Sequence, residues 1–124
     1  MRWTAVIITL SLAAGCSGRV PPAERRDRNL ITTAEIAGSE LRDAYEIVQA
    51  LRPEFLRTRG SASIRAPDPI EPVVYIDGVR SGNPETLRRV SRDALREIQY
   101  IDSREATTRF GTGHRGGAIL VVTR

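Results

Sequence analysis

The expected fold is organised around one stretch, Phe110-Gly-Thr-Gly-His-Arg-Gly-Gly-Ala-Ile-Leu-Val-Val-Thr-Arg124. Its four glycines lead into Ala118 to Val122, five consecutive apolar residues of which three are β-branched. Such a run predicts a strand that is buried on both faces. The glycines permit positive φ and close backbone approach, which a sharp turn into the centre of a sheet requires. We therefore expect this strand to lie between or beside two earlier strands, Val73–Ile76 and Glu97–Ile101.

Two helices are expected near the start of the folded part. Leu30-Ile31 suits a short opening strand, and Thr32 and Glu35 then have the spacing of a capping box, so a helix should begin there. Ser39 is expected to cap a second, amphipathic helix. The apolar positions of that helix recur at intervals of three and four residues, which places them on one face. They are Leu41, Ala44, Tyr45, Val48 and Leu51.

The middle of the chain alternates between extended segments and turns. Phe55–Arg59 is interpreted as a short strand, and Gly60–Pro72 as a loop because it holds three prolines. Val73–Ile76 is expected to be a compact strand. The dipeptide Asp77-Gly78 that follows it is a strong signal for a structural turn.

Expected helices and strands continue to alternate in the rest of the chain, and their order indicates the fold class. Asn83-Pro84 is a helix start, with Asn as the cap and Pro at the first position. Glu97–Ile101 is expected to be a strand, and Ser103–Phe110 a short helix capped by Ser103 and ended by Gly111. Helices and strands in this order favour an α+β (α/β-like) fold, in which a small mixed sheet packs with short helices.

Length and composition limit the classes of function. The chain has 124 residues, which predicts one folded domain. All positive side chains are arginines, and the formal net charge is +4. The N-terminal targeting signal disfavours nucleic acid as the partner, and an anionic lipid surface fits the charge better. A GC-rich genome is the simpler explanation of the all-arginine composition.

The N-terminus has the order of an export signal. Arg2 precedes the apolar segment Trp3 to Ala14, which is too short for a permanent membrane-spanning helix. The segment Leu12-Ala-Ala-Gly-Cys16 resembles the lipobox of bacterial lipoproteins, in which the cysteine after the cleavage site carries acyl chains such as palmitate. Residues 1–15 are then a signal peptide and Cys16 the lipid attachment site. Ala13-x-Gly15 also suits ordinary signal peptidase, so plain secretion remains an alternative.

Residues 16–29 are expected to form a tether between the membrane and a domain of residues 30–124. The tether contains two prolines and a charged run without apolar periodicity, which is typical of a solvated linker. The alternative is that Arg25, Arg26 and Arg28 contact anionic head groups. Cys16 is the only cysteine, so the fold cannot depend on an internal disulfide.

The glycine-rich loop invites a nucleotide-binding hypothesis. The spacing Gly111-x-Gly113-x-x-Gly116 matches the dinucleotide fingerprint, but that fingerprint needs a strand before the glycines and a helix after them, and here the expected order is reversed. His114, the only histidine, is expected to be an exposed loop residue and not a catalyst. We expect no cofactor, no metal and no enzymatic activity. The residues of a possible interaction loop are Gly111, Gly113, His114, Arg115, Gly116 and Gly117.

Four segments recur in a characteristic order in the second half of the chain: Pro72–Val79, Ala94–Ile101, Ala106–Gly111 and Gly116–Arg124. Together they resemble the plug domain of TonB-dependent outer-membrane receptors. In that family a strand is followed by Asp-Gly-Val, a later strand resembles Ile-Glu-x-Ile-Glu-Val-Leu, a helix ends in Ala-x-x-Tyr-Gly, and a strand of the type Gly-Gly-x-Ile-x-Ile-x-Thr-Lys closes the domain. Ile31–Leu51 resembles the opening strand and helices of the plug.

This resemblance implies a free-standing plug-like domain on a lipid anchor. We expect no receptor barrel after Arg124, and no TonB box is recognisable. The hypothesis is a non-enzymatic envelope lipoprotein, anchored in the outer membrane through Cys16 and facing the periplasm. Its partner would be an outer-membrane receptor or another envelope protein. The alternatives are a small-ligand-binding lipoprotein that uses the Gly111–Gly117 loop, and a hydrolase that depends on His114.

Overall fold

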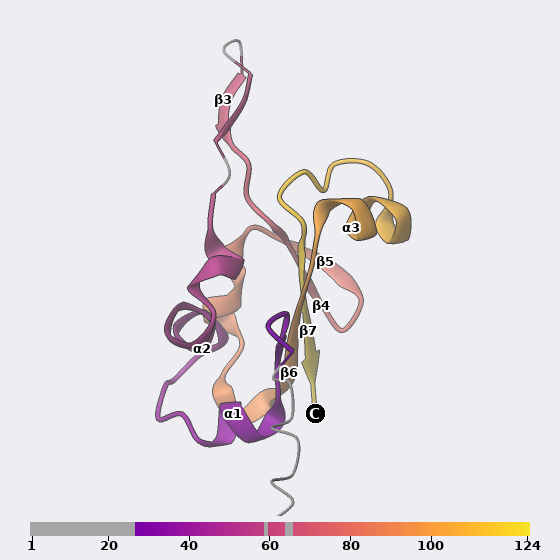
Figure 1. Cartoon of the computed structure of the whole chain (residues 1–124). Helices are drawn as coiled ribbons and strands as arrows, with labels where there is room; N and C mark the ends of the chain where they lie inside the picture. Colours follow the sequence, from indigo (N-terminus) through magenta and orange to yellow (C-terminus); the bar gives the residue numbers. More distant parts are fainter. Residues whose placement is uncertain (1–26, 59, 64–65) are drawn as a thin grey trace, which may run out of the picture.

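The computed structural model describes residues 27–58, 60–63 and 66–124. The expected signal peptide, Cys16 and most of the tether lie outside these ranges. A five-stranded mixed sheet carries helices on both faces, and a separate two-stranded hairpin projects from one end (Figure 1). The predicted α+β fold class is confirmed.

The closing strand β7 (Ala118–Thr123) lies at the centre of the sheet, whose order is β1-β6-β7-β4-β5. It pairs antiparallel with β6 (Leu95–Ile101) and parallel with β4 (Val73–Ile76). The sequence-based expectation for this strand is therefore confirmed. The two outer strands are short: β1 (Leu30–Ile31) pairs with β6, and β5 (Val79–Gly82) pairs with β4.

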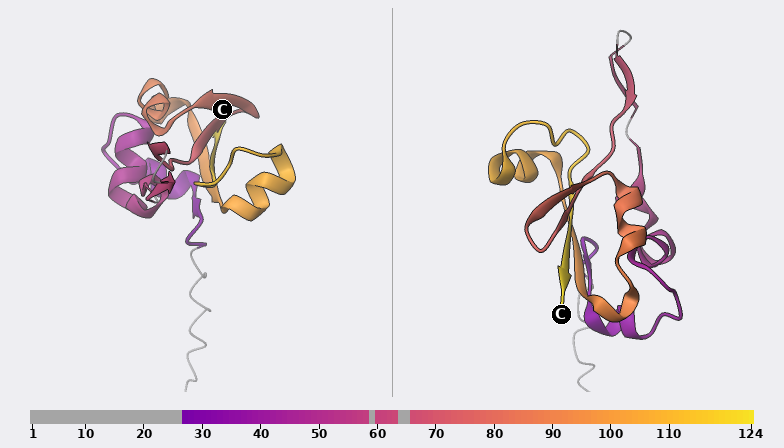
Figure 2. Two further views of the ribbon diagram at one scale, coloured as in Figure 1. Left: turned by 90° about the horizontal axis from the view of Figure 1, so that it is seen from above. Right: turned by 180° about the vertical axis from the view of Figure 1, so that it is seen from behind.

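Helices cover the two faces unequally. One face holds the larger core, which contains Ile47, Leu87 and Ile119. The other face is covered by α3 (Ser103–Phe110), on the opposite side of the sheet in the left view of Figure 2. The remaining helices are α1 (Thr33–Ala37) and α2 (Ala44–Leu51) and the 3₁₀ helices η1 (Pro53–Leu56), η2 (Pro84–Arg89) and η3 (Arg92–Ala94).

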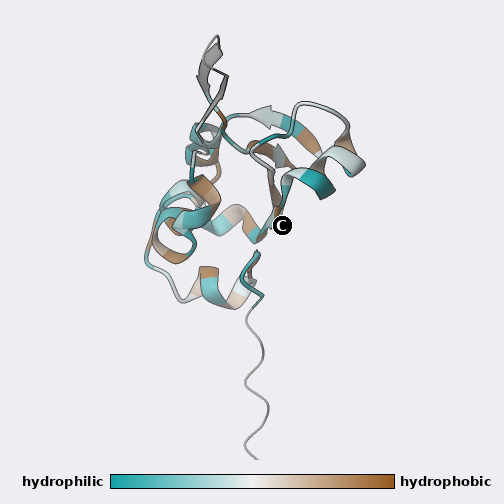
Figure 3. Cartoon of the chain, turned by 45° about the horizontal axis from the view of Figure 1, so that its top comes forward, coloured by the Kyte–Doolittle hydropathy of each residue, from teal (hydrophilic) through white to brown (hydrophobic). Residues whose placement is uncertain are grey.

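The two longest α-helices differ in how much apolar surface they offer. Apolar residues recur along α2, whereas α3 is mainly hydrophilic (Figure 3). From α3 only Ala106 and Phe110 join the smaller core, beside Val73, Tyr75 and Ala118 of the sheet. Because its core is small, this side of the sheet depends on a few specific contacts.

The start of α1 agrees with the sequence-based prediction, whereas the start of α2 differs from it. Thr32 caps α1 with the expected capping box, but α2 is capped by Asp43 and not by Ser39. The Asp43 carboxylate accepts the backbone N–H of Glu46 at 2.9 Å, while the Ser39 hydroxyl donates to the carbonyl of Ile36 at 2.7 Å and so helps to close α1. The second helix starts late because Asp43 is also paired with Ser91 in an isolated bridge.

The cap of α3 is also one residue earlier than expected. The carboxylate of Asp102, and not the hydroxyl of Ser103, accepts the backbone N–H groups of Arg104 and Glu105 at 2.8 and 2.9 Å. A carboxylate in this position also interacts favourably with the positive end of the helix dipole. Gly111 ends the helix, as expected, with φ +89°.

The segment between α2 and β4 is where the prediction is wrong. Residues 55–58, the described part of the strand expected at Phe55–Arg59, do not form a strand. Phe55 lies in η1, is buried, and stacks on Tyr100 with ring centroids 5.2 Å apart. The expected loop contains a hairpin of β2 (Ser61–Ser63) and β3 (Ala66–Pro69), which projects from the body in Figures 1 and 2. Prolines fit this hairpin because each of its strands has a free edge.

Gly116 and Gly117 bring β7 into the sheet through a gap too narrow for side chains. Gly117 has φ +83°, and a Cβ there would lie 2.5 Å from the carbonyl oxygen of Ile101 and 2.6 Å from the Tyr100 hydroxyl. A Cβ on Gly116 would meet the backbone carbonyl of Glu71. Both glycines are therefore required by close packing, and the positive φ of Gly117 is a second constraint at that position.

We predict that Gly117→Val abolishes the cooperative thermal unfolding transition or strongly lowers its midpoint temperature. The clash should cost about 1–3 kcal/mol, and a side chain at positive φ about 1–2 kcal/mol. Gly113→Ala is the matched control, because Gly113 also has positive φ but a Cβ at that position would meet no atom within 4 Å. Circular dichroism during heating measures both variants, and equal losses of stability would contradict the packing argument.

Candidate functional site

The loop between α3 and β7 contains all six residues of the predicted interaction loop. The structure divides them into two groups: Gly111, Gly113 and Arg115 are exposed, whereas Gly116 and Gly117 are buried. His114 is also buried, with only 2% of its surface exposed, so the expectation of an exposed histidine is wrong. The loop folds back on itself, and this places the imidazole against the sheet.

Both ring nitrogens of His114 have a hydrogen-bond partner. Nδ1 lies 2.8 Å from the carbonyl oxygen of Gly111, and Nε2 lies 2.8 Å from the hydroxyl of Tyr75. A carbonyl oxygen can only accept, so Nδ1 carries a proton. In the neutral ring Nε2 then accepts the hydrogen bond that the Tyr75 hydroxyl donates. This tautomer is assigned from the partners of the ring.

An aromatic cluster surrounds the imidazole. The rings of Tyr75 and Phe110 stack with centroids 4.1 Å apart, and each lies 5.8 Å from the His114 ring. The guanidinium of Arg109 lies 5.4 Å from the centroid of Phe110. Strand, helix and loop therefore meet at one point. The alternation of β4 placed Tyr75 on the same face as Val73, but no sequence signal indicated that His114 would fold back onto it.

The hydrogen bonds of the loop explain its shape without a ligand. The backbone N–H of Gly117 donates to the carbonyl of His114 at 3.0 Å, and the Gly117 carbonyl accepts the N–H of Val73 at 3.1 Å. The Tyr100 hydroxyl donates to the carbonyl of Gly116 at 3.0 Å. A helix precedes the glycines and a strand follows them, which is the reverse of the order that a dinucleotide fingerprint needs.

The Asp77-Gly78 turn has a second role beyond joining β4 to β5. Its two residues have φ +49° and +82°, the signs required at the centre of a tight type I′ turn. The Asp77 carboxylate accepts the backbone N–H of Thr123 at 2.8 Å and its hydroxyl at 2.6 Å. These bonds hold the pKa of Asp77 below its ordinary value, the Thr123 hydroxyl being the larger cause. The turn predicted from sequence therefore also holds the end of β7.

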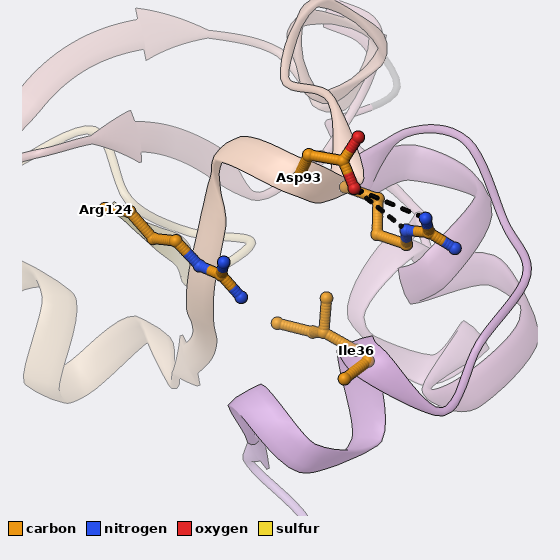
Figure 4. A pocket seen from close by; sticks show the side chains of 5 residues that line it. Ile36, Asp93 and Arg124 are labelled. Carbon is orange, nitrogen blue, oxygen red and sulfur yellow. Dashed lines mark hydrogen bonds and ion pairs between the residues drawn. The ribbon is translucent and has the colours of Figure 1, made fainter.

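Two adjoining hollows lie at the other end of the domain, near α1. The first, of about 200 Å³, is lined by Ile36, Ala37, Arg92, Asp93 and Arg124. In Figure 4 the Arg124 side chain extends toward Ile36, and Arg92 bonds to Asp93 at 3.3 Å. The second, of about 260 Å³, shares Arg92 and Asp93. Both are smaller than typical small-molecule sites of about 300–1,000 Å³, and neither is lined by the glycine loop.

The described ranges offer neither a metal-ion cluster nor a membrane-spanning helix. Residues 27–58, 60–63 and 66–124 contain no group of three or more His, Cys, Asp or Glu side chains arranged to hold a metal ion. Within the same ranges no helix is long and apolar enough to cross a bilayer.

No known protein family, curated protein or solved structure matched this chain in our comparisons.

We predict that Tyr75→Phe lowers the free energy of unfolding by about 1–3 kcal/mol, because it removes the donor and leaves a buried ring nitrogen without a partner. Urea unfolding at neutral pH measures the change. Tyr45→Phe is the matched control, since the Tyr45 ring is half-buried beneath the Arg88 guanidinium on the other side of the sheet. A loss no larger than that of the control would mean that the Tyr75–His114 bond does not stabilise the loop.

We predict that Asp77→Asn makes the loss of stability in acid shallower. A carboxylate whose pKa is lower in the folded chain contributes stability above its unfolded value, here 3.8, and loses it as the pH falls through the folded pKa. Asparagine tolerates the positive φ but carries no charge. Urea unfolding from neutral pH to about pH 3 measures both proteins. Identical slopes would contradict the role of Asp77; other carboxylates, such as Glu35, supply the remaining slope.

Proposed function

We propose that this chain is a lipid-anchored lipoprotein of the bacterial envelope whose α+β domain is a non-enzymatic interaction module. One observation carries the proposal. The four segments that resemble a receptor plug domain occupy β4 with its turn, β6, the end of α3, and β7. Three of these elements are adjacent in the sheet, in the order β6-β7-β4. Segments separated in sequence thus form one continuous unit, which supports a plug-like domain over a chance likeness of short motifs.

The distribution of charge supports a membrane-proximal tether. Residues 27–124 contain fifteen arginines against fourteen aspartates and glutamates, so the domain is nearly neutral. Most of the net charge of +4 lies in residues 1–26. A nearly neutral domain lacks the net positive charge that is typical of nucleic-acid-binding domains. Positive charge in the tether fits a segment next to anionic head groups.

In this proposal Cys16 anchors the chain in the outer membrane, and the domain faces the periplasm. Two or three acyl chains give stable anchoring, where one would be marginal. The partner is an outer-membrane receptor or another envelope protein. The exposed part of the glycine loop, at Gly111, Gly113 and Arg115, is the surface we assign to that contact.

The anchor is tested with Cys16→Ala. We expect the wild-type chain, expressed in a Gram-negative host, to incorporate radiolabelled palmitate and to fractionate with the outer membrane. The variant should incorporate none and should appear in the soluble fraction. Ser17→Ala controls for expression and export, because it leaves the cysteine in place. Undiminished labelling of the Cys16 variant would exclude this attachment site.

The interaction surface is tested by photo-crosslinking in the same host. A photoreactive residue at Thr112, in the exposed part of the loop, should give a crosslinked product that contains an envelope protein. The same residue at Gln49, on the exposed face of α2, is the control and should give much less. Equal products at both positions, or none at Thr112, would refute the assignment of the loop as the contact surface.

A further inference from the structure

His114 is the only buried polar or charged side chain in the described part of the chain, and it is the only histidine in the sequence. Histidine is the side chain that ordinarily gains its charge between about pH 5 and pH 8. Its ring joins three elements: the loop through Gly111, strand β4 through Tyr75, and helix α3 through the neighbouring ring of Phe110. A change in the charge of this ring therefore acts on the contacts that close the loop.

We propose that Gly111–Gly117 is a pH-sensitive latch, closed while Nε2 of His114 is unprotonated and accepts the Tyr75 hydroxyl, and released when that nitrogen takes up a proton. The 2.8 Å separation of Nε2 and the hydroxyl is the geometry that carries the proposal. It does not depend on lipidation, on the plug-like resemblance or on any partner.

In the closed arrangement a single proton lies between Nε2 of His114 and the hydroxyl oxygen of Tyr75. A doubly protonated ring donates from both nitrogens, so the Tyr75 hydroxyl would have to accept and turn its own proton elsewhere. Tyr75 is itself only 7% exposed, so that proton has little access to water. The charged ring would also lie in an aromatic cluster, and burying a charge without a partner is unfavourable.

The surrounding charges do not supply a counter-ion. Among the described residues no carboxylate forms an ion pair with His114 within 4.0 Å. The charged side chains nearest along the packed elements are cationic: Arg109 precedes Phe110, Arg80 is paired with Tyr75, and Arg115 follows the histidine. The other titratable groups near these elements are exposed Glu71 before β4, exposed Asp102, Arg104 and Glu105 at the start of α3, and Tyr100 of β6, whose hydroxyl bonds to Gly116.

The backbone of the loop allows it to move as a unit. Gly111, Gly113 and Gly117 have φ of +89°, +98° and +83°, and these residues lie at the start, middle and end of the loop. Glycine adopts both signs of φ at little cost, so the segment can change conformation without strain. Strand β7 begins just after Gly117 and stays paired on both sides, which confines the change to the loop. Release would expose the ring and alter the surface that the loop offers.

The experiment uses the full chain labelled with ¹⁵N, in detergent micelles. Long-range ¹H–¹⁵N spectra report the protonation of the single histidine without ambiguity, and amide hydrogen exchange reports loop opening. We expect the Nδ1–H tautomer while the ring is neutral, and both signals are followed as the pH is lowered. Exchange of the Gly117 amide, whose N–H donates to the carbonyl of His114 in the closed loop, should rise, after correction for intrinsic rates, with the same midpoint as ring protonation, by up to about tenfold per pH unit. Ring protonation without a change in this amide would overturn the proposal.

Two variants identify the groups responsible. His114→Gln keeps an amide donor for the Gly111 carbonyl but does not titrate, so corrected loop exchange should be independent of pH between about 5 and 8. Tyr75→Phe removes the opposing hydroxyl while leaving the histidine, and should reduce the ratio of exchange rates between the two pH limits. It also keeps the test decisive if the glutamine variant does not fold. A wild-type pH profile retained in either folded variant would overturn the latch.

Discussion

The structure depends on the insertion of β7 between β6 and β4. A strand that is paired on both sides and covered on both faces must enter the sheet past backbone already in place. Here the passage runs beside the carbonyls of Glu71 and Ile101, and only hydrogen atoms fit there on Gly116 and Gly117. At the other end of the strand, the Asp77 carboxylate holds Thr123. The central strand is thus fixed at its start by steric exclusion and at its end by hydrogen bonds.

The unequal cores on the two faces of the sheet give the domain a stable side and an adjustable side. On one face, α1, α2 and the 3₁₀ helices η1 and η2 bury a continuous apolar cluster. On the other, α3 contributes few apolar side chains, and the histidine with its tyrosine and phenylalanine neighbours completes the packing. The contacts that hydrogen-bonded polar groups make in a sparse core depend on the protonation state of those groups, whereas the contacts of an apolar cluster do not. This difference is why the loop, and not the sheet, is the part we expect to respond to its surroundings.

The placement of these features suits the proposed role. The glycine loop and the β2–β3 hairpin lie at the end of the domain opposite α1 and Arg124 (Figures 1 and 2). The exposed face of the loop is backbone-rich and carries one arginine, which suits contact with another protein better than enclosure of a small molecule. The hollows near α1 are shallow and separate from the loop. We therefore base the proposal of an interaction module on the loop and not on the hollows.

Four features could be predicted from neighbouring residues alone. These are the capping box at Thr32, the turn at Asp77-Gly78, the end of α3 at Gly111 and the apolar central strand, because each is set by local φ preferences or by periodicity within a few residues. The other features depend on contacts between distant parts of the chain. The start of α2 moved to Asp43 because of a bridge to Ser91, and Phe55 left a strand-like pattern to stack on Tyr100. His114, polar and flanked by glycines, was buried because Tyr75, thirty-nine residues earlier, offered a hydroxyl at hydrogen-bonding distance. Contacts between residues so far apart in sequence are set by how the sheet assembles, and no local pattern encodes them.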